Sequence, residues 1–342
     1  MYESIAYALN RTLADEMRRD PKVFILGEDV GAFGGGYQIT KDLLREFGPA
    51  RVRNTPISEI GIIGVSIGAA LTGLRPVAEI QFADFIFCGM DQLVNQAAKF
   101  HLMSGGQVKV PIVIRAPQGA TGRAAQHSQS VEAFFMHVPG IKVAMPSTPY
   151  DARGLLFTAI RDNNPVLFLE HKLLYGSTSP GGKSKSATGY LKTLTPAPEE
   201  EYTIPFGVAD VKREGKDVTV VATLFMLHLA LKAAQVLSEE GISVEVIDPR
   251  TVVPLDKDTI FSSVRKTGRL VVVSEDATTC GFASEVAALV AQDCFEALKT
   301  PIQRVCALDV PIPFAPEAEK FVLPDERKII AAVKKAVSCS RQ

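Results

Sequence analysis

Apolar runs of strand length alternate with amphipathic stretches of helix length through most of this chain, and that alternation limits its fold more than any other feature. In the first half, VFILGED (23–29), RPVAEIQF (75–82) and VPIVIRAP (110–117) are strand candidates. Helical patterns separate them, as over 59–73 and 91–104. Such alternation is typical of a mostly parallel sheet with helices on both faces. We therefore expect an α/β protein.

The alternation breaks once, at a segment rich in Gly, Ser, Pro and charged residues (176–205). It restarts with the strand candidate DVTVVAT (217–223) and continues to a final helix over about 325–338. A length of 342 residues suits two domains better than one. We predict a first domain over 1–180, a linker over 181–205 and a second, smaller α/β domain over 206–342.

Charge and composition exclude several classes of partner. The 37 basic and 38 acidic residues leave a net charge of -1, which gives no reason to expect nucleic acid or an anionic membrane surface. No apolar run reaches the roughly 18 residues of a membrane span. The N-terminus predicts an amphipathic helix without a signal peptide's apolar core, and the five scattered cysteines form no CxxC. We expect a bacterial cytoplasmic protein, or a mitochondrial matrix protein if a transit peptide was removed.

Common nucleotide and catalytic motifs are absent. GAFGGG (31–36) has Phe33 where a dinucleotide loop needs glycine, so we interpret it as a flexible turn and disfavour a stand-alone dinucleotide binder. No P-loop, GxSxG or HExxH is present. Neither is a Gly-Asp-Gly followed some 25–30 residues later by Asn-Asn.

Glu59 is the one carboxylate in the small, apolar stretch TPISEIGIIGVSIGAALTG (55–73). It suits the first turn of a helix capped by Ser58, where a carboxylate complements the dipole. Its apolar surroundings favour a second role, because burial raises a carboxyl pKa toward the range of a proton donor; the dipole acts in the opposite direction, so the net direction stays open. One face of this helix is nearly featureless, which lets another helix or a partner chain approach closely: Gly61, Gly64 and Gly68.

His127 and Gln81 are further candidates. His127 lies in a loop of small residues after a predicted strand, where an imidazole can donate a proton or hold an anion, although an ordinary loop histidine fits too. Gln81 stands near the carboxyl end of a strand, where α/β proteins bind ligands. Phe82 and Phe85 follow, and are core aromatics unless they form a stacking platform. The turn at Asp162–Pro165 is rich in oxygen donors, which also suit a hard cation.

Four long motifs carry a resemblance to a known family. NTPISEIGIIGVSIGAALTGLRPVAEIQFADF, RAAQHSQSVEAFFMHVPGIKVAMPSTPYDARGLL, IRDNNPVLFLEHKLLYG and VEVIDPRTVVPLDKDTI resemble the beta subunits of thiamine-diphosphate-dependent 2-oxo acid dehydrogenases of the pyruvate, acetoin and branched-chain types. The resemblance covers nearly the whole chain outside 176–200. It implies a transketolase-like fold, with a pyrimidine-binding domain followed by a transketolase C-terminal domain.

The resemblance also assigns residues. It implies that Glu59 hydrogen-bonds N1′ of the cofactor's aminopyrimidine and favours the imino tautomer that removes the thiazolium C2 proton. Around the same ring it places Glu28, Ile57, Gln81 and Phe85. His127 corresponds to a histidine that assists acyl transfer to lipoyl. The resemblance also implies a structural potassium site formed by Asp162 and Asn164 with the carbonyls of Ile112, Ala159 and Ile160.

Partners follow from what this chain lacks. In the family, the alpha subunit's Gly-Asp-Gly…Asn-Asn motif holds the diphosphate and its magnesium, so the resemblance implies an active site between two chains of an α2β2 assembly that serves a dihydrolipoyl acyltransferase core. We expect a subunit of an oxidoreductase acting on pyruvate or acetoin. The branched-chain type is the alternative within the family, and a non-catalytic structural beta-like chain is the alternative of another class.

Overall fold

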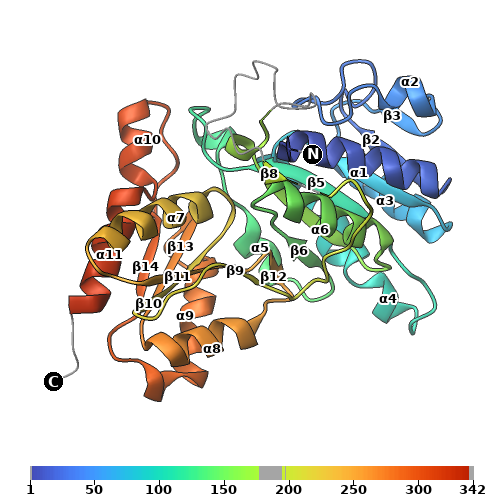
Figure 1. Ribbon diagram of the computed structural model, residues 1–342. Helices are drawn as coiled ribbons and strands as arrows, with labels where there is room; N and C mark the ends of the chain where they lie inside the picture. The colour runs from blue at the N-terminus through green and yellow to red at the C-terminus, as the bar shows by residue number, and fades with distance from the viewer. Residues whose placement is uncertain (1, 177–194, 197, 339–342) are drawn as a thin grey trace.

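The computed structural model describes residues 2–176, 195–196 and 198–338. Most of the predicted linker, 181–194 with 197, lies outside these residues. Two sheets form the cores of two halves, with the first half at one side and the second at the other (Figure 1). The expected α/β class is confirmed.

The first sheet has seven strands in the order β12-β6-β7-β5-β4-β2-β3. Its neighbouring strands are parallel, except that β12 is antiparallel to β6. The central strands are buried along their whole length, as both faces are covered. The bounds are β2 (Val23–Gly27), β3 (Val52–Asn54), β4 (Arg75–Glu79), β5 (Val113–Gln118), β6 (Lys142–Ala144), β7 (Val166–His171) and β12 (Thr251–Val253).

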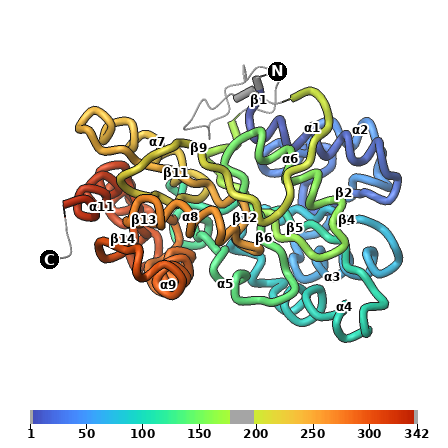
Figure 2. The backbone as a smooth tube through the Cα atoms, turned by 60° about the horizontal axis from the view of Figure 1, so that its bottom comes forward, coloured from blue at the N-terminus to red at the C-terminus, as the bar shows by residue number. Residues whose placement is uncertain are grey.

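Helices lie on both sides of this sheet. α1 packs against α6 on one side, and α3 lies with η1, η2 and α4 on the other (Figure 2). The α-helices are α1 (Ile5–Arg19), α2 (Leu43–Phe47), α3 (Glu59–Leu71), α4 (Phe100–Met103), α5 (Glu132–Met136) and α6 (Pro149–Arg161). The 3₁₀ helices are η1 (Ala83–Gly89), η3 (Ala125–His127) and η4 (Lys172–Leu174), and η2 (Gln92–Ala97) is a π-helix.

The second sheet has five strands in the order β14-β13-β10-β11-β9, and only β9 runs antiparallel to its neighbour. The strands are β9 (Asp210–Arg213), β10 (Val218–Ala222), β11 (Val244–Asp248), β13 (Leu270–Ala277) and β14 (Gln303–Ala307). The helices are α7 (Leu224–Glu239), α8 (Lys257–Thr267), α9 (Phe282–Asp293), η6 (Phe295–Ala297), α10 (Pro316–Val322) and α11 (Glu326–Ser338). A separate two-stranded pair joins β1 (Tyr2–Glu3) to β8 (Thr195–Pro196).

Capping residues in the sequence set several helix ends. α6 begins where the Thr148 hydroxyl accepts from the Asp151 N–H (3.1 Å), and Pro149 opens its first turn. The Asp256 carboxylate caps α8 in the same way, and Gly268 ends it in the left-handed conformation.

Two elements differ from the sequence-based expectation. The helix predicted over 91–104 is divided into η2 and α4. At the division, the backbone of Gly140 approaches so closely that an added methyl group would lie 2.2 Å from the Ala98 carbonyl oxygen. The strand β12 was not expected, and it takes three residues of the second half into the first sheet (Figure 2). Among the described residues, no helix is both long and apolar enough to cross a membrane.

Candidate active site

The predicted site residues come together at the carboxyl edge of the first sheet. Glu28 directly follows β2, Gln81 follows β4 by two residues, and His127 lies in the loop after β5. Because β2, β4 and β5 are parallel neighbours, their carboxyl ends meet at this edge. Glu59 is the first residue of α3, which packs against η1, the element that contains Phe85.

Glu59 enters the site from the capped end of α3. Ser58 precedes it, and the Ser58 hydroxyl accepts from the Gly61 N–H (3.3 Å). Burial raises the pKa of Glu28, and the nearby carboxyl groups of Asp29 and Glu59 raise it further. Three carboxyl groups therefore lie near one another at this edge, and two of them act against the ionisation of Glu28.

The surroundings of Glu59 are more open than we expected. Its side chain is half-buried, and Ile57 beside it is 76% exposed. Only one face of α3 is covered, and Ile60 and Val65 on the other face stay exposed. Among the described residues, nothing covers Ile60 and Val65 on the second face of α3, so this chain alone does not enclose Glu59.

The glycine-rich loop 31–36 closes over this edge. Gly35 has a φ of +80°, and an added methyl group would lie 2.5 Å from Oε1 of the buried Glu79. Its N–H donates to the Asp29 carbonyl (2.9 Å). Only glycine allows both the conformation and the approach. The loop contains turns, as predicted, and Gly35 lets it lie against the side chain of Glu79.

His127 stands in an aromatic cluster. Its ring meets those of Phe82 and Phe85 edge to face, with centroids 4.8 and 5.4 Å away. Tyr37 extends the cluster, 6.2 Å from the Phe82 ring. Predicted residues 42 positions apart in sequence, Phe85 and His127, are therefore in contact, and they present an apolar face beside the carboxyl groups.

The loop that carries His127 is held by both halves of the chain. From the second half, Glu275 accepts from the Ala120 N–H (2.6 Å), and Glu319 of α10 accepts from the Gly122 N–H (2.9 Å). From the first half, Asp84 accepts from the backbone and side-chain N–H groups of Gln129 (3.1 and 2.9 Å). The other oxygen of Glu275 pairs with His171 at the end of β7 (2.8 Å).

A buried ionic network lies beneath the edge. Arg115 on β5 donates to both oxygens of Glu170 (2.7 and 2.8 Å) and to Glu79 (2.8 Å). Burial raises the pKa of Glu79, while Arg115 acts to lower it. The network joins β4, β5 and β7, so it fixes the strands from which the site residues project.

The residues predicted to bind potassium also come together, but other donors engage them. Arg75 donates to the carbonyls of Ile160 and Asp162 (2.9 Å each). Lys142 pairs with the Asp162 carboxylate, whose other oxygen accepts from the Asn164 N–H (2.9 Å). The carbonyls of Ile112 and Ala159 accept from the N–H groups of Val166 and Asp162. Among the described residues, no group of three or more His, Cys, Asp or Glu side chains could hold a metal ion.

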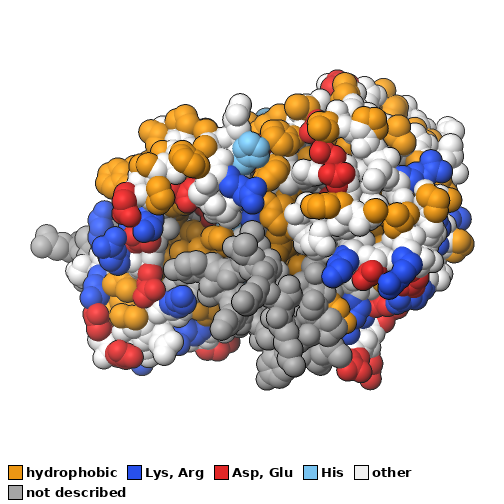
Figure 3. Space-filling view, turned by 90° about the horizontal axis from the view of Figure 1, so that it is seen from above, with side chains coloured by type: hydrophobic (Ala, Val, Ile, Leu, Met, Phe, Trp, Pro, Cys, Tyr) orange, Lys and Arg blue, Asp and Glu red, His pale blue; other side chains and the backbone are white. Residues whose placement is uncertain are grey.

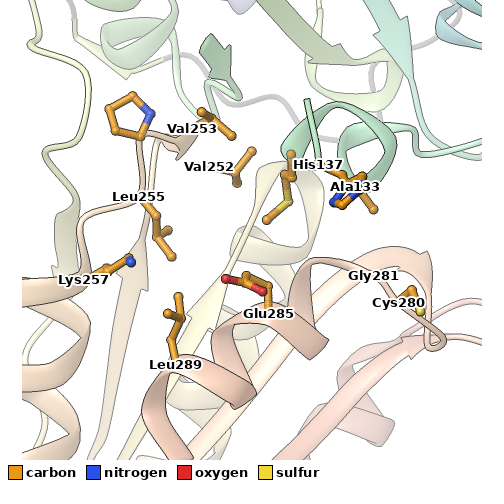
Figure 4. A pocket seen from close by; sticks show the side chains of 12 residues that line it. Ala133, His137, Val252, Val253, Leu255, Lys257, Cys280, Gly281, Glu285 and Leu289 are labelled. Atoms are coloured by element: carbon orange, nitrogen blue, oxygen red, sulfur yellow. The ribbon is translucent and has the colours of Figure 1, made fainter. Parts of the chain in front are cut away.

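A hollow of about 390 Å³ lies elsewhere, between α5, the segment after β12, and α9. His137, Lys257 and Glu285 are the titratable side chains at its wall, with Leu255 and Leu289 among the apolar ones (Figure 4). None of the predicted site residues lines it. Apolar side chains also cross the middle of the face seen from above, where the two halves meet (Figure 3).

Sequence reasoning missed the residues that hold the site in place. Glu275 and Glu319 lie outside the motifs quoted above, and Lys172 lies within one of them without an assigned role. All three meet the His127 loop through tertiary contacts. Arg115 could have been noticed in the sequence, because it is a charged residue within an otherwise apolar predicted strand.

The fold and this edge place the chain in the transketolase-like class. Residues 3–178 match the model of the transketolase pyrimidine-binding domain, and residues 207–329 match that of the transketolase C-terminal domain. A solved structure described as a split-gene transketolase, inactive beta4 tetramer, superposes with a TM-score of 0.78 at 25% identity and covers 100% of both chains.

Curated relatives narrow the class. The beta subunit of acetoin:2,6-dichlorophenolindophenol oxidoreductase from Cupriavidus necator is 46% identical, over 98% of this chain and 97% of its own. The pyruvate dehydrogenase E1 beta subunit of Rickettsia felis (46%; 98% of each) and the 2-oxoisovalerate dehydrogenase beta subunit of Bacillus subtilis (46%; 96% of each) are as similar. The chain belongs to the family of beta subunits of the 2-oxo acid and acetoin dehydrogenases, which are oxidoreductases.

Proposed function

We propose that this chain supplies the pyrimidine-binding half of a thiamine-diphosphate site in a pyruvate- or acetoin-type dehydrogenase. The observation that supports this most directly is the gathering of Glu28, Glu59, Gln81, Phe85 and His127 at one sheet edge. The half-buried carboxyl groups can bind the polar edge of an aminopyrimidine. The exposed Ile57 and the ring of Phe85 can pack against its faces. The residues present fit the group.

Glu59 carries the central role in this proposal. When bound, the cofactor supplies the carbon nucleophile and electron sink for decarboxylation. Glu59 holds a proton on its carboxyl oxygen at the pyrimidine nitrogen. The carboxyl group of Glu28 lies near that of Glu59 and, in this proposal, binds the same polar ring edge. In this proposal His127, whose ring lies 5.4 Å from that of Phe85, assists acyl transfer to a lipoyl group.

The open face of α3 supports a site shared with a second chain. The relatives are named as beta subunits, and this sequence lacks the Gly-Asp-Gly…Asn-Asn pattern for a diphosphate and its magnesium. We propose that an alpha subunit supplies that pattern in an α2β2 assembly and covers Ile57 and Ile60. A dihydrolipoyl acyltransferase core is the proposed acyl acceptor. Relatives from bacteria and plant mitochondria support the bacterial cytoplasm or the mitochondrial matrix as the location.

Co-expression with the alpha subunit tests the proposal. Glu59→Gln should still assemble and bind thiamine diphosphate, but its decarboxylation should fall by about 10²–10⁴-fold, the range of a lost acid–base group. His127→Ala should keep activity with 2,6-dichlorophenolindophenol and lose transfer to lipoyl. Normal turnover by Glu59→Gln contradicts the assigned role, and normal lipoyl transfer by His127→Ala makes that histidine a bystander.

The same preparation distinguishes the alternatives. Activity with pyruvate, acetoin and branched-chain 2-oxo acids assigns the substrate, because the Bacillus subtilis relative carries a 2-oxoisovalerate name at equal identity. A complex that assembles but turns over none of them supports the non-catalytic structural chain.

The potassium site stays a separate proposal. The donors are carbonyl and carboxylate oxygens, which suit a hard cation. A potassium ion there has to compete with Lys142 for the Asp162 carboxylate.

A further inference from the structure

Lys172 is a buried charged residue that the proposed reaction does not use. It is the first residue of η4, immediately after β7, and its side chain is fully buried. Its ammonium group donates to the backbone carbonyl of His127. The same nitrogen lies 5.2 Å from the centre of the Phe82 ring, against which the His127 imidazole also packs. Lys172 and His127 are thus joined twice, by a hydrogen bond and through Phe82.

The charges around Lys172 explain how the ammonium is tolerated. Burial lowers its pKa to about 8, and the carboxylates of Asp84, Glu275 and Glu319 act to raise it. Arg123, in the His127 loop, acts to lower it. At neutral pH the group still carries its proton, so its bond to the carbonyl is charge-assisted and stronger than one between neutral groups.

The hydrogen bond from Lys172 holds the middle of the His127 loop, between the points where other residues hold it. Glu275 and Glu319 hold it at Ala120 and Gly122, and Asp84 holds it at Gln129. Between these anchors, Ala124 has a φ of +60°, which a residue with a Cβ rarely adopts. A strained residue of this kind persists where its surroundings hold it, and the Lys172 bond is made three residues further on.

We propose that Lys172 is a positioning residue that fixes the His127 loop and keeps the imidazole edge-on to Phe82 and Phe85. The loop-fixing part stands on the geometry alone. Its effect on turnover rests on the role proposed above for His127.

Hydrogen–deuterium exchange on the complex with the alpha subunit tests the loop-fixing part. Lys172→Met removes the donor and the charge while keeping the length, and exchange of a peptide spanning 123–129 should rise about tenfold, which corresponds to about 1.4 kcal/mol. Lys212→Met is the matched control, because Lys212 is also mostly buried but pairs with Asp151 and Asp210. Equal exchange in the two variants overturns the proposal. If Lys172→Met does not assemble, Lys172→Gln replaces it, with a smaller rise expected and the same outcome against the proposal.

Measurements of lipoyl transfer then distinguish the proposed role of Lys172 from the proposed role of His127. Lys172→Met should slow transfer to lipoyl about tenfold and leave activity with 2,6-dichlorophenolindophenol nearly unchanged. In a His127→Ala background it should slow transfer no further; an additional tenfold loss there shows that Lys172 does not act through His127 and overturns its positioning role. Raised exchange with normal lipoyl transfer supports the fixing of the loop and contradicts the proposed role of His127.

Discussion

Two groups of buried carboxyl side chains in this molecule have different kinds of hydrogen-bond partner. In the first sheet, Glu79 and Glu170 share the guanidinium of Arg115. At the junction of the halves, Glu132 of α5 accepts from the Gln118 amide (2.8 Å), and Asp276 of β13 accepts from the Ser274 hydroxyl and the Phe282 N–H. Within the described part of the chain, neither Glu132 nor Asp276 forms an ion pair.

The consequence appears in their protonation. Burial, together with repulsion from Asp276, raises the pKa of Glu132 to about 8. Burial raises the pKa of Asp276 as well. Neutral hydrogen-bond donors satisfy a buried carboxyl group without holding it ionised, whereas a guanidinium works against its protonation. The neutral donors around Glu132 and Asp276 make the junction sensitive to pH. The shared guanidinium makes the first sheet dependent on Arg115.

Removing that arginine should have the largest effect. Arg115→Met leaves two carboxyl groups buried without their partner, so we expect a loss of about 3–5 kcal/mol in the free energy of unfolding, measured by urea denaturation. Arg18→Met, which breaks a largely exposed pair with Glu46, is the control and should cost no more than about 1 kcal/mol. Equal losses in the two variants would contradict the comparison.

The next largest effect should come from Glu275, which connects the second half to Ala120 and His171 of the first. Glu275→Gln keeps an acceptor for the Ala120 N–H but turns an amide N–H₂ toward the ring nitrogen of His171. The other ring nitrogen of His171 accepts from the Leu173 N–H, so the nitrogen that faces residue 275 is a donor, and two donors then meet. We expect a loss of about 1–3 kcal/mol, with faster hydrogen exchange in the 119–131 loop. A variant with unchanged stability would show that the loop does not depend on the second half.

A smaller effect should follow pH at Glu132. Its folded-state pKa of about 8 exceeds the ordinary 4.5, so the folded chain binds the extra proton between these values and its stability falls as pH rises through that range. Glu132→Gln does not titrate and keeps the acceptor for Gln118. Relative to the parent, the variant should gain roughly 1 kcal/mol between pH 6 and pH 7, because each pH unit between the two pKa values is worth about 1.4 kcal/mol. A constant difference across the range would place the proton elsewhere.

The smallest effect concerns Asp162, whose partner is Lys142. Burial acts to raise the pKa of Asp162, but the bonds from Lys142 and Asn164 lower it. Replacing sodium with potassium should stabilise the parent chain by less than about 1 kcal/mol, as expected for a weakly held ligand. Lys142→Met should show a larger gain, because the carboxylate is then free for a cation. No gain in either protein would remove the case for the potassium site.

Much of the fold was predictable because local patterns and tertiary structure agree. β5 and β10 are apolar runs buried on both faces, and their boundaries fall within about three residues of the ranges predicted at 110–117 and 217–223. β12 was not predictable, since three residues carry no period and their partner strand lies over 100 positions away. The division between η2 and α4 escaped for a similar reason, because it lies where a distant glycine approaches.

The site divides in the same way. Glu59 and Gln81 could be predicted from their place at element ends, and the contact of His127 with Phe85 agrees with that edge. The partial exposure of Glu59 was not predictable. An apolar helix has the same sequence pattern whether its second face packs against its own chain or against another chain. Lys172 and Glu275 act through contacts with residues distant in sequence, which a local sequence pattern does not show.

The short strand β12 bears on how the polypeptide matures on the ribosome. Until residue 253 has emerged, β6 is an unpaired edge of an otherwise assembled sheet, able to capture a strand from a neighbouring nascent chain. A truncated product that stops in the region between the halves keeps that edge permanently. We therefore expect a fragment that ends before β12 to aggregate more readily than the whole chain.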